Sequence, residues 1–240
     1  MRTSLLTIAL AVCFCPSAFA QLDETLKKAD DAIENRDASG LSNDKIIAGL
    51  RQALELSTTK AVALASKQDG FLDNPAIRIL LPPKIQAVGK AMRLLGEGDE
   101  VDELEVGMNR AAEHAAPQAK QIFLDALKKM SFTDARHILT GGPTAATDYF
   151  RRTSAADLTT AFTPAVHSSM QRIGVIKKYD HVIKTAPGGS AISSEFDLDK
   201  YVVDKTLDGI FYLLGQEEIK IRRNPADQTT DLLKEVFGRK

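Results

Sequence analysis

The stretch that decides the fold, residues 197–223, reads DLDKYVVDKTLDGIFYLLGQEEIKIRR. Apolar side chains recur in it at helical spacing: Val203, Leu207, Ile210, Leu214 and Ile221. Asp197 is a good N-cap residue, and Glu218 can pair with Arg222 four positions later. The pattern predicts an amphipathic helix. We expect it to be the longest helix of the chain and the spine of a helix bundle.

Much of the remaining chain repeats this three-to-four spacing. It predicts further helices over residues 22–35, 42–66, 83–95, 101–115, 117–130, 131–140, 144–152, 154–173, 175–183 and 230–237. Ser131 begins a sequence that resembles a capping box, and Ser154 begins a second. Pro164 is expected to kink or split the helix that contains it, and residues 186–190 to form a mobile surface loop.

One segment, Phe71–Leu81, follows a different pattern. Ile77, Ile79 and Leu81 alternate with other residues, which is typical of extended backbone. No series of strands accompanies it, so a parallel sheet is not expected. The fold class predicted is all-α, a single-domain irregular helical bundle with one short extended β-like arm that protrudes.

The N-terminus has the composition of a secretory signal peptide. Arg2 supplies a positive charge, residues 5–14 are apolar, and residues 18–20 read Ala-Phe-Ala, a small-x-small cleavage site. The apolar run is too short to span a hydrocarbon core of about 30 Å. We therefore expect export with cleavage near Ala20, and divide the chain into a signal peptide (1–20), a leading helix and linker (21–40) and a single helical domain (41–238).

Both cysteines, Cys13 and Cys15, lie within the segment expected to be removed. The mature chain would then be cysteine-free, which excludes thiol chemistry and disulfides. A lipoprotein reading, with Cys13 lipidated and retained, is the alternative, and it is disfavoured because Val12 stands where a small residue is normally required.

The charge balance argues against nucleic-acid binding. The chain holds 31 basic and 32 acidic residues, a net charge of −1 that becomes −2 without Arg2, and the signs alternate along most segments. A protein that binds phosphates along a duplex would show a basic excess or stripe. No later apolar run is long enough for a transmembrane span.

Searches for catalytic and metal-binding motifs fail. The four histidines, His114, His137, His167 and His181, show no ligand spacing, so no metal is implied. The chain has no Gly-x-Ser-x-Gly elbow, no Ser-x-x-Lys and no phosphate-binding loop. No cofactor or catalytic residue is indicated, which favours a non-enzyme without deciding the question.

Five polar side chains are not explained by helix capping. They are Arg110, Glu113, Tyr149, Arg151 and Arg152. If folding brought them together, the arginines could clamp a small carboxylate or phosphate, with the tyrosine donating a further hydrogen bond. The competing interpretation, which we favour, is an interhelical ion-pair network.

Several long segments resemble the bacterial family called domain of unknown function 4197. They are residues 69–79, 109–113, 145–151, 197–199, 224–225 and 229–234, and the resemblance covers residues 41–238. One departure is Leu80, where the family pattern has proline. The resemblance implies an exported bacterial protein of the periplasm, and brings no activity, cofactor or catalytic residue.

The function expected from these observations is a non-enzymatic periplasmic binding or interaction module. We expect exposed apolar residues of the arm to dock an unknown protein partner; these are Phe71, Leu72, Ile77 and Ile79. The alternative is an enzyme or receptor for a small anion that uses the arginine and tyrosine set. The expected location is periplasmic or secreted, with a lipid anchor disfavoured.

Overall fold

The structure is a computed structural model that describes residues 42–185 and 196–223. Contacts divide the chain into two units, residues 1–45 and 46–240, and the second contains the described residues from Ile46 on. The predicted signal peptide, both cysteines, the leading helix at 22–35, the loop at 186–190 and the final helix at 230–237 lie outside the described residues.

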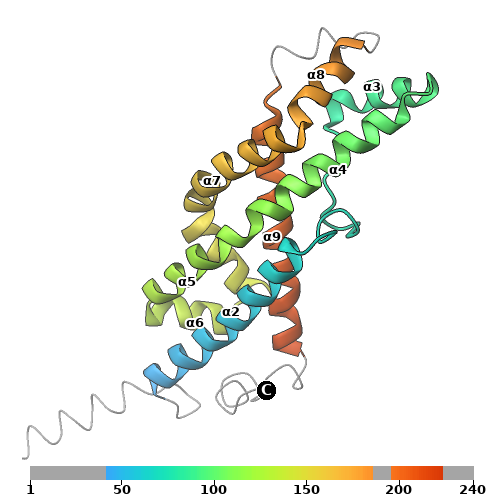
Figure 1. The fold of residues 1–240 in the computed structure, drawn as a ribbon. Coiled ribbons are helices and arrows are strands. Elements are labelled where there is room, and N and C mark those ends of the chain that lie inside the picture. The colour runs from blue at the N-terminus through green and yellow to red at the C-terminus, as the bar shows by residue number, and fades with distance from the viewer. Residues whose placement is uncertain (1–41, 186–195, 224–240) are drawn as a thin grey trace, which may run out of the picture. The chain divides into compact units, whose positions relative to one another are not determined.

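The described part is built from helices, which confirms the all-α prediction (Figure 1). In chain order they are α2 (Asn43–Ser66), α3 (Pro83–Leu94), α4 (Gly98–Ala115), the 3-10 turn η1 (Ala116–Gln118), α5 (Ala119–Lys129), α6 (Phe132–Thr140), α7 (Ala145–Ile173), α8 (Val175–Thr185) and α9 (Leu198–Arg223). No β-strand occurs in residues 42–185 or 196–223.

The core lies where α4, α7 and α9 meet. Among the described elements, α7 has its most extensive contacts with α9 and α4. Three buried aromatic rings from α5, α7 and α9 pack edge to face, with the Phe123 centroid 5.0 Å from that of Phe150 and 5.9 Å from that of Phe211. Such pairs add to the free energy of burial, so these rings tie the three helices together.

Local signals place several helix ends as predicted. Ser131 and Asp134 form a capping box, and Gly96 ends the α3 region with a φ of 86°. The Asp197 side chain accepts a hydrogen bond of 2.9 Å from the Lys200 N–H, so it caps α9. These ends depend on residues close in sequence, which is why the sequence predicts them.

Two predictions about helix length are wrong. Residues 145–173 form a single helix of 29 residues, so α9, with 26, is not the longest. Ser154 does not start a helix; it is buried within α7 because the apolar stripe of that helix continues through it. Pro164 has no N–H, so the carbonyl of Thr160, four residues earlier in α7, loses its helical hydrogen bond. The helix tolerates this loss because both residues are exposed and water can bind the carbonyl.

Candidate functional site

Three polar side chains of α4 hold the segment that the sequence predicts as an arm, Phe71–Leu81. Glu105, Asn109 and Glu113 follow one another four residues apart, so they share one face of the helix, and all three are buried. The Asn109 side chain accepts a hydrogen bond of 2.8 Å from the Ile79 N–H and donates one of 2.8 Å to the Ile79 carbonyl. The amide of Asn109 therefore pairs with Ile79 as a neighbouring strand would.

The two glutamates bind further backbone groups of the arm. Glu105 accepts a hydrogen bond of 3.2 Å from the Leu81 N–H. Glu113 accepts bonds of 3.1 and 3.3 Å from the N–H groups of Phe71 and Leu72. Backbone hydrogen bonds close successive turns between Asp69 and Arg78, so the expectation of an extended arm is wrong for that part, and only residues 78–82 are free of turns. Both parts are bound by side chains of a helix instead of by another strand.

Cations neutralise these buried carboxylates. Arg110 contacts Glu113 at 2.7 Å and Asp69 at 2.6 Å, and Arg78 lies 3.7 Å from Glu105. The hydrogen bond to Glu113 is the main cause that raises the pKa of Arg110 above its usual value. Arg110 therefore forms one ion pair within α4, with Glu113, and a second with Asp69, just before the arm.

Arg110 and Tyr149 do not meet. His114 of α4 lies 3.0 Å from Ser169 of α7, and Gly107 lies against Ile173, so the C-terminal half of α4, which contains Arg110, runs beside the C-terminal end of α7. Tyr149 is twenty residues before Ser169 in the same helix, about 30 Å along its axis. The expectation that these side chains form one anion clamp is therefore wrong.

Tyr149 and Arg152 lie at a separate hollow of about 450 Å³. The buried Tyr149 hydroxyl donates a hydrogen bond of 3.0 Å to the Ala126 carbonyl, and burial raises the pKa of Tyr149. The Arg152 guanidinium lies 5.8 Å from the Tyr149 ring centroid. Charged groups that line this hollow include three carboxylates, of Asp125, Asp134 and Asp157, against Lys129 and Arg152. An anion is disfavoured there.

Arg151 lies at a third place. Its guanidinium is 4.4 Å from the Phe211 ring centroid on α9 and 3.8 Å from Asp208. The residues predicted as one ligand site thus separate into Arg110 with Glu113, Tyr149 with Arg152, and Arg151 alone. Consecutive residues on a helix point about 100° apart, which is why Arg151 and Arg152 face different neighbours.

Another buried carboxylate, that of Glu218 on α9, fills the N-terminus of α7. It accepts hydrogen bonds of 2.9 Å from the N–H groups of both Ala146 and Thr147, and one of 2.8 Å from the Thr147 hydroxyl. Arg222 pairs with it at 2.8 Å. A helix N-terminus is an anion-binding site, and here the chain's own glutamate occupies it.

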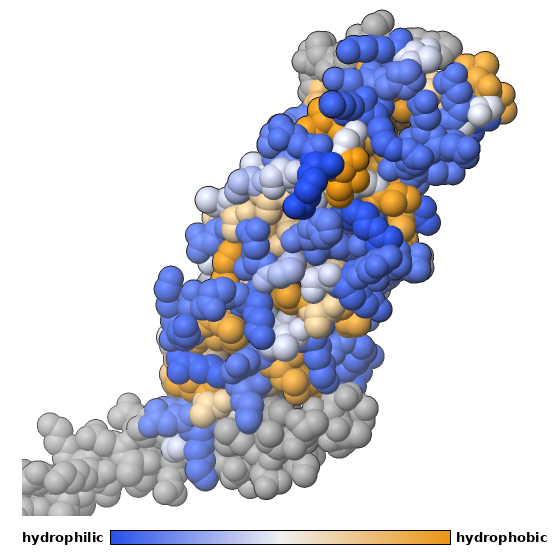
Figure 2. Space-filling view, viewed as in Figure 1, coloured by the Kyte–Doolittle hydropathy of each residue, from blue (hydrophilic) through white to orange (hydrophobic). Residues whose placement is uncertain are grey.

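The apolar residues predicted to dock a partner are not on the surface. Phe71 and Ile79 have no exposed area, Ile77 is 6% exposed, and Leu72 is half-buried. The expectation of an exposed apolar arm is wrong for these residues, because Phe71 and Ile77 pack against Gly209 of α9 while Asn109 and Glu113 of α4 hold the backbone of the segment. The face of the molecule seen in Figure 2 is mostly hydrophilic, with small separate hydrophobic patches.

The opposite side of the arm borders a groove of about 680 Å³ beside α9. Two large apolar side chains that line it are exposed: Leu80 from the arm, at 51%, and Tyr212 from α9, at 44%. Arg78 and Lys205 also line the groove, with Asp208 lying 3.4 Å from the Lys205 amine. Sequence reasoning missed this groove, although Leu80 breaks the alternation of the arm and Tyr212 falls outside the apolar stripe of α9.

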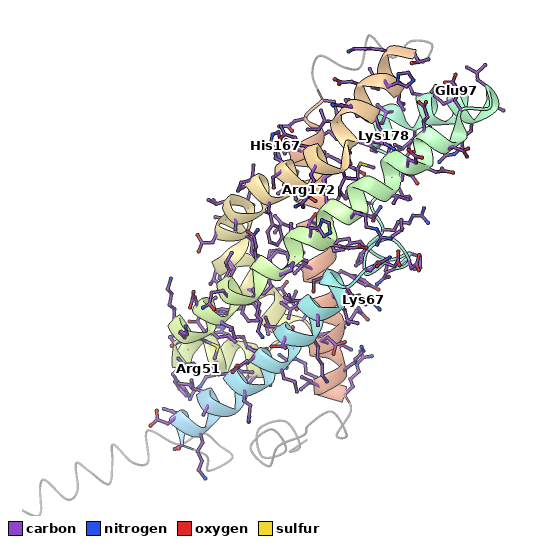
Figure 3. All side chains as sticks on the ribbon, in the orientation of Figure 1. Arg51, Lys67, Glu97, His167, Arg172 and Lys178 are labelled. Atoms are coloured by element: carbon purple, nitrogen blue, oxygen red, sulfur yellow. The ribbon has the colours of Figure 1, made fainter. Side chains whose placement is uncertain are left out.

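The histidines give no metal centre in the part of the chain that the structure describes, where no group of three or more His, Cys, Asp or Glu side chains could hold an ion. His167 of α7, labelled in Figure 3, pairs with Asp199, and His181 lies 3.2 Å from Glu100. These pairs join neighbouring helices. In the same residues, none of the helices has the length and apolar composition that crossing a membrane requires.

Comparison with known proteins gives one match. The family described as "Protein of unknown function (DUF4197)" matches residues 40–238. The chain belongs to the DUF4197 family. No curated protein and no solved structure matches it.

Three of the segments that carry the DUF4197 resemblance take part in the hydrogen-bonded clusters of the arm and of the α7 N-terminus. The stretches at 69–79 and 109–113 contain most of the groups that join the arm to α4. The stretch at 145–151 contains the N-terminal groups of α7 that bind Glu218. In this DUF4197 chain the stretches at 69–79, 109–113 and 145–151 therefore have a structural role.

Proposed function

We propose that this chain is an exported, non-enzymatic periplasmic binding module, and that it binds a polypeptide partner in the groove between the arm and α9. The observation that carries the proposal is the pair of exposed side chains, Leu80 and Tyr212, on opposite walls of that groove. Exposed aromatic and aliphatic groups that line a concavity are typical of binding surfaces. The proposal of export is supported by the composition of residues 1–20.

The groove is better suited to this role than the hollow beside Tyr149 or the N-terminus of α7. Its volume lies within the usual range for ligand sites of about 300 to 1,000 Å³, and its walls are built on α9 and on an arm fixed by buried hydrogen bonds. The hollow beside Tyr149 is rich in carboxylates, and the anion site at the start of α7 is filled by Glu218. The alternative function, as an enzyme or receptor for a small anion, has lost the geometry on which it depended.

The test is selection of heptapeptides from a displayed library against the mature chain, followed by measurement of their affinity for purified variants. Tyr212→Ala removes one wall of the groove and should weaken binding at least about tenfold, as loss of a central aromatic contact does. Val106→Ala is the matched control, because Val106 is 37% exposed and lines a different hollow. Equal binding by both variants would show that the groove is not the binding surface. Thermal stabilisation by phosphate or citrate, lost on Arg152→Ala, would favour the alternative function.

A further inference from the structure

The backbone of the arm has one occupied edge and one open edge. Both the N–H and the carbonyl of Ile79 bind Asn109 of α4. The peptide bonds of the described chain are all trans, so the carbonyl before each N–H points the opposite way. The Arg78 carbonyl and the Leu80 N–H therefore point away from α4.

The side to which they point is that of the groove. The Leu81 N–H binds Glu105 of α4, so the Leu80 carbonyl also points away from α4, and it accepts a hydrogen bond of 3.0 Å from the Tyr201 hydroxyl of α9. Tyr201, Arg78 and Leu80 all line the groove. Among the described residues, neither the Arg78 carbonyl nor the Leu80 N–H has a hydrogen-bond partner.

A free carbonyl and a free N–H on the two residues that flank Ile79 match one residue of a parallel strand. In a parallel pair, that residue donates its N–H to the carbonyl on one side and accepts from the N–H on the other. We propose that the groove binds an extended segment of a second polypeptide, running parallel to residues 78–82, and that one of its residues pairs with the Arg78 carbonyl and the Leu80 N–H. This inference rests on the proposed function and names the form of its ligand.

The walls of the groove define the side chains that such a segment carries. Leu80 and Tyr212 offer apolar contact to alternate residues of an extended peptide. Arg78 and Lys205 also line the groove, and each is already paired, Arg78 with Glu105 and Lys205 with Asp208, so these cations give the lining no charge excess. The complementary ligand is therefore an extended segment with apolar side chains at alternate positions, recognised through its main chain by strand addition.

The probe is the fluorescein-labelled peptide acetyl-Asp-Val-Thr-Val-Asp-amide, titrated into the mature chain with polarisation as the readout. Each backbone amide of the peptide is then N-methylated in turn, which removes one donor and leaves every side chain in place. Pairing with the arm predicts that methylation of one interior residue weakens binding about tenfold and that methylation of its neighbours has a much smaller effect. Absence of binding to the unmethylated peptide, or an equal effect at all positions, overturns the inference.

Two variants test the same bond from the protein side. Leu80→Pro removes the N–H and fits extended backbone, whereas Leu80→Ala removes the side chain and keeps the N–H. We expect the proline variant to bind the probe about tenfold more weakly than the alanine variant. Equal binding by the two overturns the strand pairing but leaves the proposed function standing if Tyr212→Ala still weakens binding of the selected heptapeptides. If the proline variant does not fold, the N-methyl series on the unmodified protein decides.

Discussion

Replacement of Asn109 by leucine tests whether helix side chains hold the arm in place. Asn109 has no exposed area, and its side chain makes hydrogen bonds of 2.8 Å to the N–H of Ile79, to the carbonyl of Ile79 and to the carbonyl of Glu105. Leucine has nearly the same shape as asparagine, so Asn109→Leu removes these bonds without opening a cavity. The two backbone groups of Ile79 are then buried without a partner.

The magnitude follows from the number of groups left unpaired. Each buried polar group without a partner costs about 1 to 3 kcal/mol, and the added apolar contact of leucine offsets part of the sum. The third bond matters less because the Glu105 carbonyl lies within α4, where it has a backbone partner. We expect the free energy of unfolding to fall by about 3 kcal/mol.

The assay is urea unfolding followed by circular dichroism, since the chain has no tryptophan. With a slope near 2 kcal/mol per molar urea, a loss of about 3 kcal/mol lowers the midpoint by about 1.5 M. Hydrogen exchange supplies a local readout, because the Ile79 amide should lose protection by about a hundredfold. Met108→Leu is the matched control: Met108 is the adjacent buried residue of α4, and a volume-conserving apolar exchange there should cost less than about 1.5 kcal/mol.

The reasoning would be refuted by an Asn109→Leu variant that unfolds within about 1 kcal/mol of the parent chain. It would also fail if the control lost as much stability as the leucine variant, because general sensitivity of α4 would then explain both. Unchanged exchange at the Ile79 amide, with a lower midpoint, would place the loss somewhere other than the arm.

Three further predictions use the same unfolding assay. Glu218→Gln weakens the charge-assisted bonds at the start of α7 and should cost about 2 to 3 kcal/mol, whereas Glu217→Gln, which loses an ion pair to one exposed lysine, should cost less than about 1 kcal/mol. Gly209→Ala places a Cβ 2.5 Å from a phenylalanine ring of the arm and should cost about 1 to 3 kcal/mol, whereas Gly142→Ala meets no atom within 4 Å and should change stability by less than about 0.5 kcal/mol. Asp134→Asn should destabilise the protein at neutral pH. The hydrogen bond from the capping serine lowers the pKa of Asp134 from 3.8, so this stabilisation is present above that pH and disappears as the pH falls through the lowered value.

Each of these predictions has an outcome that contradicts it. Similar losses in the two glutamine variants would mean that the α7 N-terminus does not depend on Glu218. A neutral Gly209→Ala variant would mean that the arm can move away from α9. A difference between the parent chain and Asp134→Asn that is constant from pH 7 to well below pH 3.8 would remove the charge of Asp134 as its cause.

The sequence predicts most helices of the described part because their signals are local. Hydrophobic periodicity, the capping box at Ser131 and the left-handed Gly96 involve residues within a few positions of one another. The division of α7 at Ser154 fails for the converse reason. A capping serine and a proline oppose a continuous helix locally, but burial of the shared apolar stripe against α4 and α9 outweighs them.

The candidate site was only partly predictable. The pairing of Arg110 with Glu113 follows from their spacing on one helix face. No signal in the neighbouring residues shows that Tyr149 lies about 30 Å along the α7 axis from Ser169, the residue that contacts His114 of α4. The predicted clamp therefore combines residues that are far apart. The predicted exposure of the arm's apolar side chains is wrong because alternation separates a segment into two faces but does not show which face another helix covers.

By itself, the sequence determined the helical content, most of the helix ends and the extended character of residues 78–81, and its N-terminal composition is the basis on which export is proposed. The tertiary structure alone decided which edge of the arm is occupied and which borders the groove. The physical reason is that an extended segment has no hydrogen-bond partners of its own. Asn109 and Glu105, some 25 to 30 residues further along the chain, satisfy one edge of it and leave the Leu80 N–H open on the other.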